Sequence, residues 1–418
     1  MRARRQKILG RGDQNAAMTS NVADNGARGG GFVGRLLKYV LILLLVGALL
    51  FAGGAWYFSG VIGSDALSVD PAQPEYVTTV DRTGTGTVSL LPNDTQPETG
   101  KAGVFGLRWS DGWGQLGAII DGEGASTVTR RYSAREGGTP ADGTLTDVNS
   151  TVYIGNPREA LGLEYLDVPI PGELGPMPAY LVPAPRSTWV IYVHGKGSTR
   201  EEGYRALSTL QPLGYPGLLI TYRNDVGAPQ DPSGEYGYGL REWKDLESAV
   251  AYSLANGADD VVLAGWSMGG AIVGQFLERS PLAERVTGLL LDSPALDMPA
   301  AIELGASQRS LPLVGLPIPA ALTSAALWTS DRRFPTDLSS AVTTDSIKAF
   351  AGPVMVAQGS DDETTPPAVS DDVVAARTQA KLPTRYLRID DAGHVESWNV
   401  ARERYIRALT TFTADLAR

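Results

Sequence analysis

One short segment of the sequence is typical of a nucleophilic serine. The residues GWSMG at 265–269 follow the apolar run 260–264 and precede a helical pattern over 268–278. This is G-x-S-x-G in the strand–turn–helix context in which a sharp turn exposes a serine hydroxyl at the end of a strand. The glycines leave room for that turn, and the helix N-terminus directs its positive dipole end toward a developing oxyanion. The segment predicts Ser267 as the nucleophile of an acyl-transfer reaction.

A serine hydroxyl is a weak nucleophile at neutral pH and needs a neighbouring base. The 418-residue chain has no cysteine and only two histidines, His194 and His394. His394 follows the last predicted strand, 384–389, which agrees with the order nucleophile, acid, base along the chain. His194 comes too early for that order, so we expect it to form hydrogen bonds within its own loop. We predict His394 as the general base.

The third residue of such a site is a carboxylate that fixes the histidine tautomer and stabilises the imidazolium. Three adjacent candidates, Asp361, Asp362 and Glu363, follow the strand predicted over 353–357. Asp292, at the end of the run 286–291, is a further alternative, although Asp-Ser-Pro there is equally typical of a turn. These residues by themselves leave the choice open.

The segment HGKGS at 194–198 ends the predicted strand 188–193. A loop in this place supplies one oxyanion-binding N–H, and the residue after the nucleophile supplies the other. This assigns the oxyanion hole to the backbone amides of Lys196 and Met268, supported by His194 and Gly195. Glycine lets the backbone approach a substrate closely.

Four segments together resemble the α/β-hydrolase superfamily, and within it the monoacylglycerol-lipase and serine-aminopeptidase-like branch. They are HGKGS at 194–198, GWSMGG at 265–270, QGSDDETTP at 358–366 and GHVES at 393–397. The resemblance covers about residues 161–418 and implies a serine hydrolase without a metal or an organic cofactor. Laid on the family's acid-loop pattern, it places the acid on Asp362. Gln358 and Thr365 stand where the family commonly has histidine and valine.

The elements that must position these residues alternate between strand and helix. Buried strands are predicted at 188–193, 217–222, 260–264, 286–291, 353–357 and 384–389, and helices at 201–210, 240–255, 268–278, 366–379 and 397–416. This alternation predicts a doubly wound, mostly parallel α/β sheet, with its site at the carboxyl ends of the strands. A hairpin over 166–182 precedes it. A cap is expected at about 297–341, where the apolar stretch 311–322 either lines an acyl-sized pocket or is buried core.

The N-terminal region has a different composition from the rest of the chain. Residues 1–38 carry eight basic and two acidic side chains, so the formal charge of −10 divides into +6 there and −16 on the remaining residues. The charge-free run 39–58 is long enough to cross a bilayer as a helix. We predict a basic, disordered cytoplasmic tail (1–34), a transmembrane helix (35–60) and an extracytoplasmic body, with the orientation given by the positive-inside rule. A cleaved signal peptide is the alternative.

Residues 61–160 are predicted to form a β-rich module or extension without chemistry of its own. Asp-Gly and Gly-Gly turn signals separate short apolar runs at 77–80, 87–91, 117–120 and 151–154. Nothing in this segment excludes a binding module for cell-envelope material.

The expectation from the sequence is therefore a single-pass membrane protein that cleaves carboxylic esters, lipid or acyl esters in particular. A peptidase or an acyltransferase would use the same residues, and a non-catalytic envelope binding protein is the alternative from another class. The acidic body argues against nucleic acid as a partner. The lack of cysteine excludes disulfides and a cysteine nucleophile.

Overall fold

The computed structural model describes residues 27–69, 73–122, 124–312 and 314–416. Most of the predicted tail, 1–26, lies outside these ranges. The chain divides into two compact units, Met1–Gly54 and Ala55–Arg418.

Helix α1, Ala27–Ile62, contains the apolar run and is continued by a π-helical turn, Gly63–Leu67. At 1.5 Å per residue its 36 residues measure about 54 Å. By length and composition it is able to cross a membrane, and the side chains of its most apolar window are not buried in the protein. From Ala55 onward the helix belongs to the second unit, where Ala55, Ser59 and Leu67 are buried.

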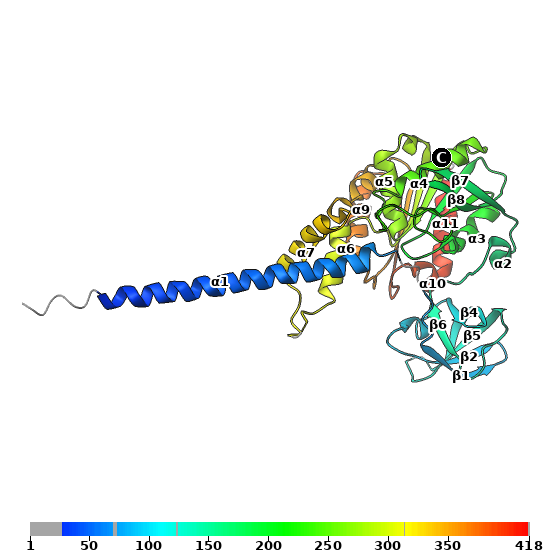
Figure 1. Ribbon diagram of the computed structural model, residues 1–418. Helices are drawn as coiled ribbons and strands as arrows, with labels where there is room; N and C mark the ends of the chain where they lie inside the picture. Colours follow the sequence, from blue (N-terminus) through cyan, green and yellow to red (C-terminus); the bar gives the residue numbers. More distant parts are fainter. Residues whose placement is uncertain (1–26, 70–72, 123, 313, 417–418) are drawn as a thin grey trace, which may run out of the picture. The chain divides into compact units, whose positions relative to one another are not determined.

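The second unit is built on an eight-stranded sheet in the order β14-β13-β12-β11-β9-β10-β8-β7. Figure 1 labels two of its strands, β7 and β8, at one edge. Its strands are β7 Leu166–Gly172, β8 Gly175–Val182, β9 Thr188–Val193, β10 Gly217–Ile220, β11 Asp260–Trp266, β12 Val286–Asp292, β13 Val354–Gly359 and β14 Thr384–Ile389. Strands β9 to β14 pair in parallel, whereas β7 and β8 form an antiparallel hairpin at one edge. The mostly parallel α/β sheet and its hairpin are as the sequence predicts.

Because successive side chains of a strand point to opposite faces, each strand contributes to two separate cores. Ile191 and Leu263 pack on one face with helices α4, α5, α8 and α9, whereas Tyr192 and Val262 pack on the other with α3 and α11. These helices are α3 Tyr204–Leu210, α4 Trp243–Ala255, α5 Met268–Arg279, α8 Thr344–Ala349, α9 Pro367–Gln379 and α11 Arg402–Leu416. The short helices α2 Pro157–Leu161 and α10 Ser397–Val400 complete this part of the chain. A sheet covered on both faces explains the continuously apolar strands.

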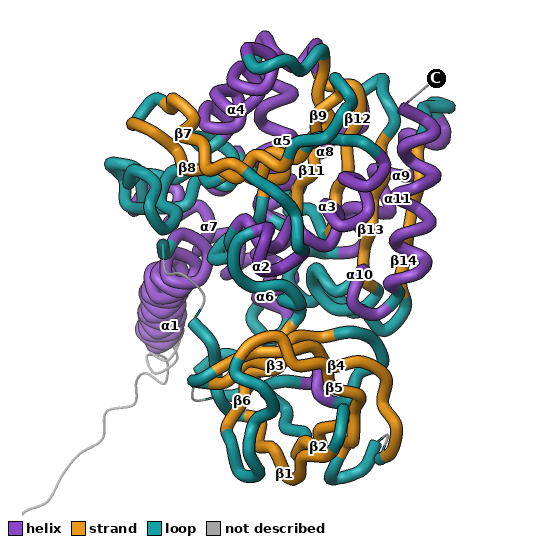
Figure 2. The backbone as a smooth tube through the Cα atoms, turned by 90° about the vertical axis from the view of Figure 1, so that its right-hand side faces the viewer, coloured by secondary structure: helices purple, strands orange, loops and turns teal. Residues whose placement is uncertain are grey.

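Residues 78–149 form a closed six-stranded antiparallel barrel in the order β1-β2-β5-β4-β3-β6 (Figure 2). The strands are β1 Thr78–Gly84, β2 Thr87–Leu91, β3 Phe105–Trp109, β4 Gly112–Asp121, β5 Val128–Glu136 and β6 Leu145–Asn149. Val80, Leu90, Phe105 and Leu107 fill its interior. The run 151–154, expected as a strand, pairs with no named strand. Val152 and Tyr153 are instead buried in the core between the eight-stranded sheet and helices α3 and α11.

The expected cap contains two helices, α6 Met298–Ser307 and α7 Ala320–Arg333. The apolar stretch 311–322 runs from the loop between them into the start of α7. Its described residues are mostly exposed, and among them Leu322 is buried. The alternative of a buried core is therefore wrong for this stretch, because its residues lie in a connecting loop and in the first turn of α7.

Candidate active site

Ser267 lies between the end of β11 and the start of α5, in a backbone conformation that few non-glycine residues adopt (φ 49°, ψ −119°). The turn is possible because its neighbours lack a Cβ. A Cβ on Gly269 would overlap the carbonyl oxygen of Val193, and one on Gly265 would lie 2.7 Å from the backbone of Gly269. The amide of Ser267 donates to the Asp292 carbonyl at 3.1 Å, which ties the turn to β12.

The structure brings Ser267, His394 and Asp362 into one chain of contacts. Nε2 of His394 lies 2.9 Å from the Ser267 hydroxyl, and Nδ1 lies 3.0 and 2.9 Å from the two carboxylate oxygens of Asp362. The His394 side chain is 23% exposed, whereas that of Asp362 is fully buried. The imidazole is thus positioned to accept the serine proton while the carboxylate holds its other nitrogen.

Asp362 is held by neighbours that include both departures from the family pattern. Its carboxylate accepts hydrogen bonds from the Gln358 amide at 2.8 Å, from the Thr365 hydroxyl at 2.8 Å and from the amides of Thr364 and Thr365. Burial disfavours its charged form, but the contacts with His394 and Thr365 outweigh this effect and lower the pKa of Asp362. Gln358 and Thr365 therefore replace histidine and valine with side chains that keep the acid ionised.

The other candidate acids do not contact His394 through a hydrogen bond in the structure. Asp361 is exposed and accepts from Ser360, and Glu363 is exposed. Asp292 is fully buried at the end of β12, and neither of its carboxylate oxygens has a hydrogen-bond partner among the described residues. Burial raises the pKa of Asp292 to about 6, against the opposing effect of Arg205.

The loop after β9 lies against the serine, as expected for an oxyanion loop. A Cβ on Gly195 would lie 3.0 Å from Cβ of Ser267, so a larger residue there would press against the serine side chain. Lys196 follows in this loop, and Met268 is the first residue of α5. The backbone amides of Lys196 and Met268, predicted to bind the oxyanion, thus lie in the loop after β9 and at the start of α5.

His194 contacts a carboxylate that the sequence did not single out. Its Nε2 lies 2.9 Å from Asp225, its Nδ1 lies 2.9 Å from the Gly195 carbonyl, and its ring stacks on Tyr222 at 4.5 Å. Burial lowers the pKa of His194, but Asp225 outweighs burial and the net shift is upward. The predicted hydrogen bond of His194 within its own loop is found with the Gly195 carbonyl, whereas the contact with Asp225 lies outside that loop.

Residues of the barrel contact the loop that carries His394, which the sequence gave no reason to expect. Glu396 accepts from the Gly393 amide at 2.7 Å and forms an ion pair with Lys101 at 2.7 Å. The Asn399 side chain donates to the carbonyls of Val104 and Ser150 at 2.8 and 2.9 Å. The segment that follows the predicted base is thus attached to a domain almost 300 residues earlier in the chain.

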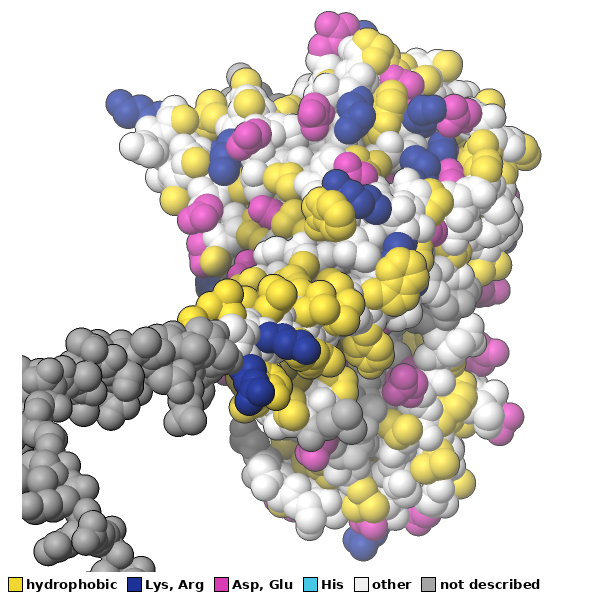
Figure 3. All heavy atoms as spheres, turned by 60° about the vertical axis from the view of Figure 1, so that its left-hand side comes forward, with side chains coloured by type: hydrophobic (Ala, Val, Ile, Leu, Met, Phe, Trp, Pro, Cys, Tyr) yellow, Lys and Arg dark blue, Asp and Glu magenta, His cyan; other side chains and the backbone are white. Residues whose placement is uncertain are grey.

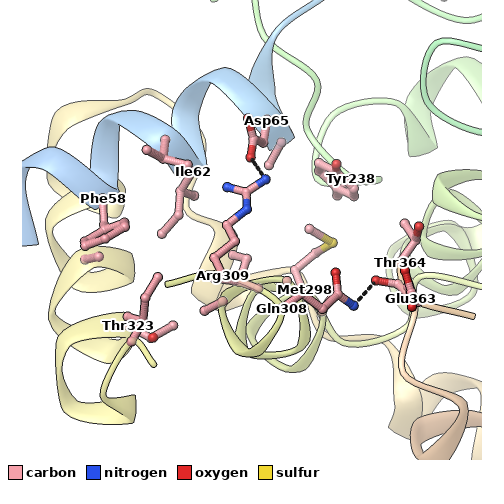
Figure 4. A pocket seen from close by; sticks show the side chains of 18 residues that line it. Phe58, Ile62, Asp65, Tyr238, Met298, Gln308, Arg309, Thr323, Glu363 and Thr364 are labelled. Carbon is pink, nitrogen blue, oxygen red and sulfur yellow. Dashed lines mark hydrogen bonds and ion pairs between the residues drawn. The ribbon is translucent and has the colours of Figure 1, made fainter. Parts of the chain in front are cut away.

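A cavity of about 320 Å³ lies on another side of the site, next to the acid loop. The last turns of α1, the cap helices and residues 363–364 line it, and Ile318 is the one described residue of 311–322 in the lining (Figure 4). Its lining does not include Ser267 or His394. In the described part of the chain, no group of three acidic or histidine side chains is placed to hold a metal ion.

Comparison with known proteins assigns two regions. Residues 190–408, more than half of the chain, match the alpha/beta hydrolase family, and residues 77–149 match a domain of unknown function, DUF8805. No curated protein matches the sequence.

Several solved structures are similar over the same part of the chain. An esterase of Pyrococcus furiosus is 18% identical, covers 63% of this chain and 95% of its own, and has a TM-score of 0.49. An alpha-beta hydrolase of Vibrio vulnificus is 20% identical, covers 60% of this chain and 81% of its own, and has a TM-score of 0.46. A thermophilic esterase of Thermogutta terrifontis is 17% identical, covers 60% and 99%, and has a TM-score of 0.43. Similarity at this level carries no information on the substrate.

Proposed function

The chain belongs to the alpha/beta hydrolase family, and we propose that it is a membrane-anchored serine hydrolase that cleaves carboxylic esters, with lipid or acyl esters as its substrates. The observation that carries the proposal is the continuous contact from the Ser267 hydroxyl through His394 to Asp362, with each step at 2.9–3.0 Å. The lowered pKa of Asp362 supports it, because the acid must stay ionised to stabilise an imidazolium.

In the proposed reaction, the Ser267 oxygen attacks the ester carbonyl while Nε2 of His394 takes the hydroxyl proton. The amides of Lys196 and Met268 bind the oxyanion of the tetrahedral intermediate. The intermediate collapses, the C–O bond to the alcohol breaks, and the imidazolium of His394 gives its proton to the leaving alkoxide. Water then attacks the acyl-serine, His394 takes its proton and returns it to Ser267, and the carboxylic acid leaves.

The reaction is tested by labelling the full-length protein with a fluorophosphonate, beside Ser267→Ala and His394→Ala variants. We expect the wild type to be labelled and to hydrolyse p-nitrophenyl butyrate, and both variants to lose labelling and turnover. A wild-type protein that neither reacts with the probe nor hydrolyses any ester overturns the proposal. Faster cleavage of aminoacyl amides than of esters would identify a peptidase instead.

The membrane part of the proposal rests on α1 and on the charge distribution. The charge-free run 39–58 lies inside one continuous helix, and the basic excess of the sequence precedes it. These features support a cytoplasmic N-terminus and an extracytoplasmic catalytic domain in the cell membrane.

The absence of cysteine makes the topology directly measurable. Ala16→Cys places a thiol in the N-terminal tail, and Ala380→Cys places one at an exposed position of the catalytic unit. In intact cells, a membrane-impermeant maleimide is expected to label Ala380→Cys and to label Ala16→Cys only after lysis. The reverse pattern overturns the orientation, and a mature N-terminus near Trp56 identifies a cleaved signal peptide.

A further inference from the structure

The end of α1 is built into the catalytic unit and is not joined to it by a free linker. The Arg333 guanidinium donates to the Trp56 carbonyl at 2.7 Å and to the Ser59 hydroxyl at 2.6 Å. In the following turn Asp65 forms an ion pair with Arg309 at 2.6 Å, and the Leu67 carbonyl accepts from the Tyr236 amide at 3.0 Å. These contacts fix the last turns of α1 against the cap.

Between α1 and the cap lies the cavity of about 320 Å³, at the lower end of the usual range of about 300–1,000 Å³ for ligand pockets. Its walls are mainly apolar, and both the helix and the cap contribute to them. The lining includes Phe58 and Ile62 of α1, Ala301 and Ile302 of α6, and Ala326 of α7. The residues that end the charge-free run of the sequence therefore form one wall of a pocket in the catalytic unit.

The two ends of the cavity have different neighbours. Phe58 and Thr323 lie at one end, and Tyr238, Glu363 and Thr364 lie at the other (Figure 4). Glu363 and Thr364 directly follow the triad acid, and the Gln308 side chain donates to the Glu363 carbonyl at 2.8 Å. The cavity thus extends from the end of the membrane-spanning run to the acid loop of the active site.

The surface next to α1 has the composition of a membrane interface. Trp56 and Trp328 are 59% and 58% exposed, and Arg333 and Arg332 lie over their rings at 3.9 and 3.5 Å. The α6–α7 loop adds exposed Val314 and Leu316. Figure 3 shows a face on which hydrophobic side chains gather with basic side chains among them. Tryptophan prefers the headgroup level of a bilayer, and arginine binds phosphate.

We infer that α1 is part of the substrate site: the cavity between α1 and the cap binds an acyl chain that enters from the outer leaflet of the membrane in which α1 is anchored. This rests on the proposed hydrolase activity and deepens it by naming the substrate as a membrane lipid ester. An acyl chain has no hydrogen-bonding groups to leave unpaired between apolar walls. A peptide would lose hydrogen bonds there, at a cost for each buried polar group.

Gly305 of α6 offers a direct test, because it lines the cavity and a Cβ there would meet no atom within 4 Å. The series Gly305→Ala, Gly305→Leu and Gly305→Phe adds bulk inside the cavity without a clash at the first atom. Ser307→Phe is the matched control, because Ser307 is an exposed residue of the same helix outside the lining. The full-length variants are reconstituted into phosphatidylcholine vesicles.

Hydrolysis is compared for p-nitrophenyl butyrate in solution and p-nitrophenyl palmitate in the vesicles. We expect kcat/KM for palmitate to fall stepwise along the series, by about 100-fold for Gly305→Phe, since each methylene in an apolar pocket is worth about tenfold or more. Butyrate hydrolysis is expected to change less than about threefold, and Ser307→Phe to match the wild type. Equal losses on both esters, or unchanged palmitate hydrolysis, overturn the inference.

The binding step is separable from catalysis in the Ser267→Ala background. Vesicles contain a phosphatidylcholine with a diazirine at the end of one chain, and the cross-linked peptides are mapped after irradiation. We expect adducts on the lining residues 58–62 and 301–306 that disappear with Gly305→Phe, while adducts on 39–52 remain as an internal control. Adducts on 39–52 alone overturn the inference. A wild-type protein that hydrolyses the butyrate ester but never the palmitate ester also overturns the inference and leaves the proposed hydrolase function standing. A wild-type protein that does not react with the fluorophosphonate overturns both the inference and the proposed function.

Discussion

The barrel contacts the loop that carries His394 and the cap lies next to the acid loop, but their contacts are of opposite kinds. The barrel approaches the His394 loop through an ion pair and directed hydrogen bonds, from Lys101 to Glu396 and from Asn399 to the barrel backbone. The cap and the end of α1 instead present an apolar cavity to the acid loop. Directed polar contacts fix the position of a group, whereas apolar walls select a ligand by size and shape. We therefore propose that the barrel positions His394 and that the cap selects the substrate.

The largest expected effect concerns Asp362, the acid that contacts His394. Asp362→Asn removes the acceptor for Nδ1 of His394, and kcat is expected to fall by about 10,000-fold on short and long esters alike. Asp292→Asn is the matched control and is expected to stay within a few-fold of the wild type, because Asp292 has no hydrogen bond to His394. The measurement is kcat for p-nitrophenyl butyrate. A crippling effect of Asp292→Asn would transfer the role of the acid to β12.

The second prediction concerns the contact between the barrel and the loop that carries His394. Glu396→Ala removes the acceptor of the Gly393 amide and the partner of Lys101, so the loop that carries His394 loses one of its attachments to the barrel. We expect kcat to fall about tenfold with little change in KM, since a small misplacement of a catalytic group is costly. The loss should be equal for butyrate and palmitate esters.

Lys101→Met gives the matched measurement from the barrel's own residue. It removes the ion pair but leaves the bond from Gly393 to Glu396, so a smaller loss of kcat is expected. If either variant impairs palmitate hydrolysis selectively, the barrel contributes to substrate selection and the division between the two regions is wrong.

The third prediction concerns the cap side. Arg333→Ala removes two hydrogen bonds to α1, each with a net value of about 1 kcal/mol. We expect kcat/KM for palmitate in vesicles to fall about fivefold, because the wall formed by α1 loosens, and butyrate hydrolysis to stay unchanged. The exposed Arg407→Ala serves as a control for the loss of a positive charge. Equal effects on both esters would assign Arg333 to general stability.

The smallest effect is a pH dependence of stability on the barrel side. Burial, with Glu396 adding to it, raises the pKa of Glu98 from 4.5 to about 7. Because the folded pKa lies above the unfolded one, the associated stability is full below pH 4.5 and is lost as pH rises through 7. Glu98→Gln should therefore unfold at higher urea concentration than the wild type at pH 8. Exposed Glu136→Gln is the control, and equal midpoints for wild type and Glu98→Gln at pH 8 would contradict this account.

Much of the catalytic sheet could be predicted from the sequence, because strands and turns are encoded locally. The run 384–389 coincides with β14, and 188–193 with β9. The positions of Ser267 and His394 could also be predicted from the sequence, since the nucleophile segment is a local pattern and the chain has only two histidines. Helix α1 was expected over 35–60 and extends over Ala27–Ile62. Its passage through a membrane stays a prediction.

The choice among Asp361, Asp362 and Glu363 required more than spacing. Three neighbouring side chains of a loop point in different directions, and only the packing of the loop decides which one meets His394. The family resemblance selected Asp362, and the structure shows why the residues that depart from the family pattern are compatible with it: Gln358 and Thr365 bind its carboxylate.

The sequence by itself determined the sheet, the positions of the candidate residues Ser267 and His394 and the apolar helix, because these depend on short-range periodicity and on residue types a few positions apart. The tertiary structure alone decided that the barrel supports the histidine loop and that the end of α1 forms a wall of the cavity. Lys101 and Glu396 are 295 positions apart, and Trp56 and Arg333 are 277 apart. Such contacts depend on how separate elements pack, and no local pattern in this sequence records them.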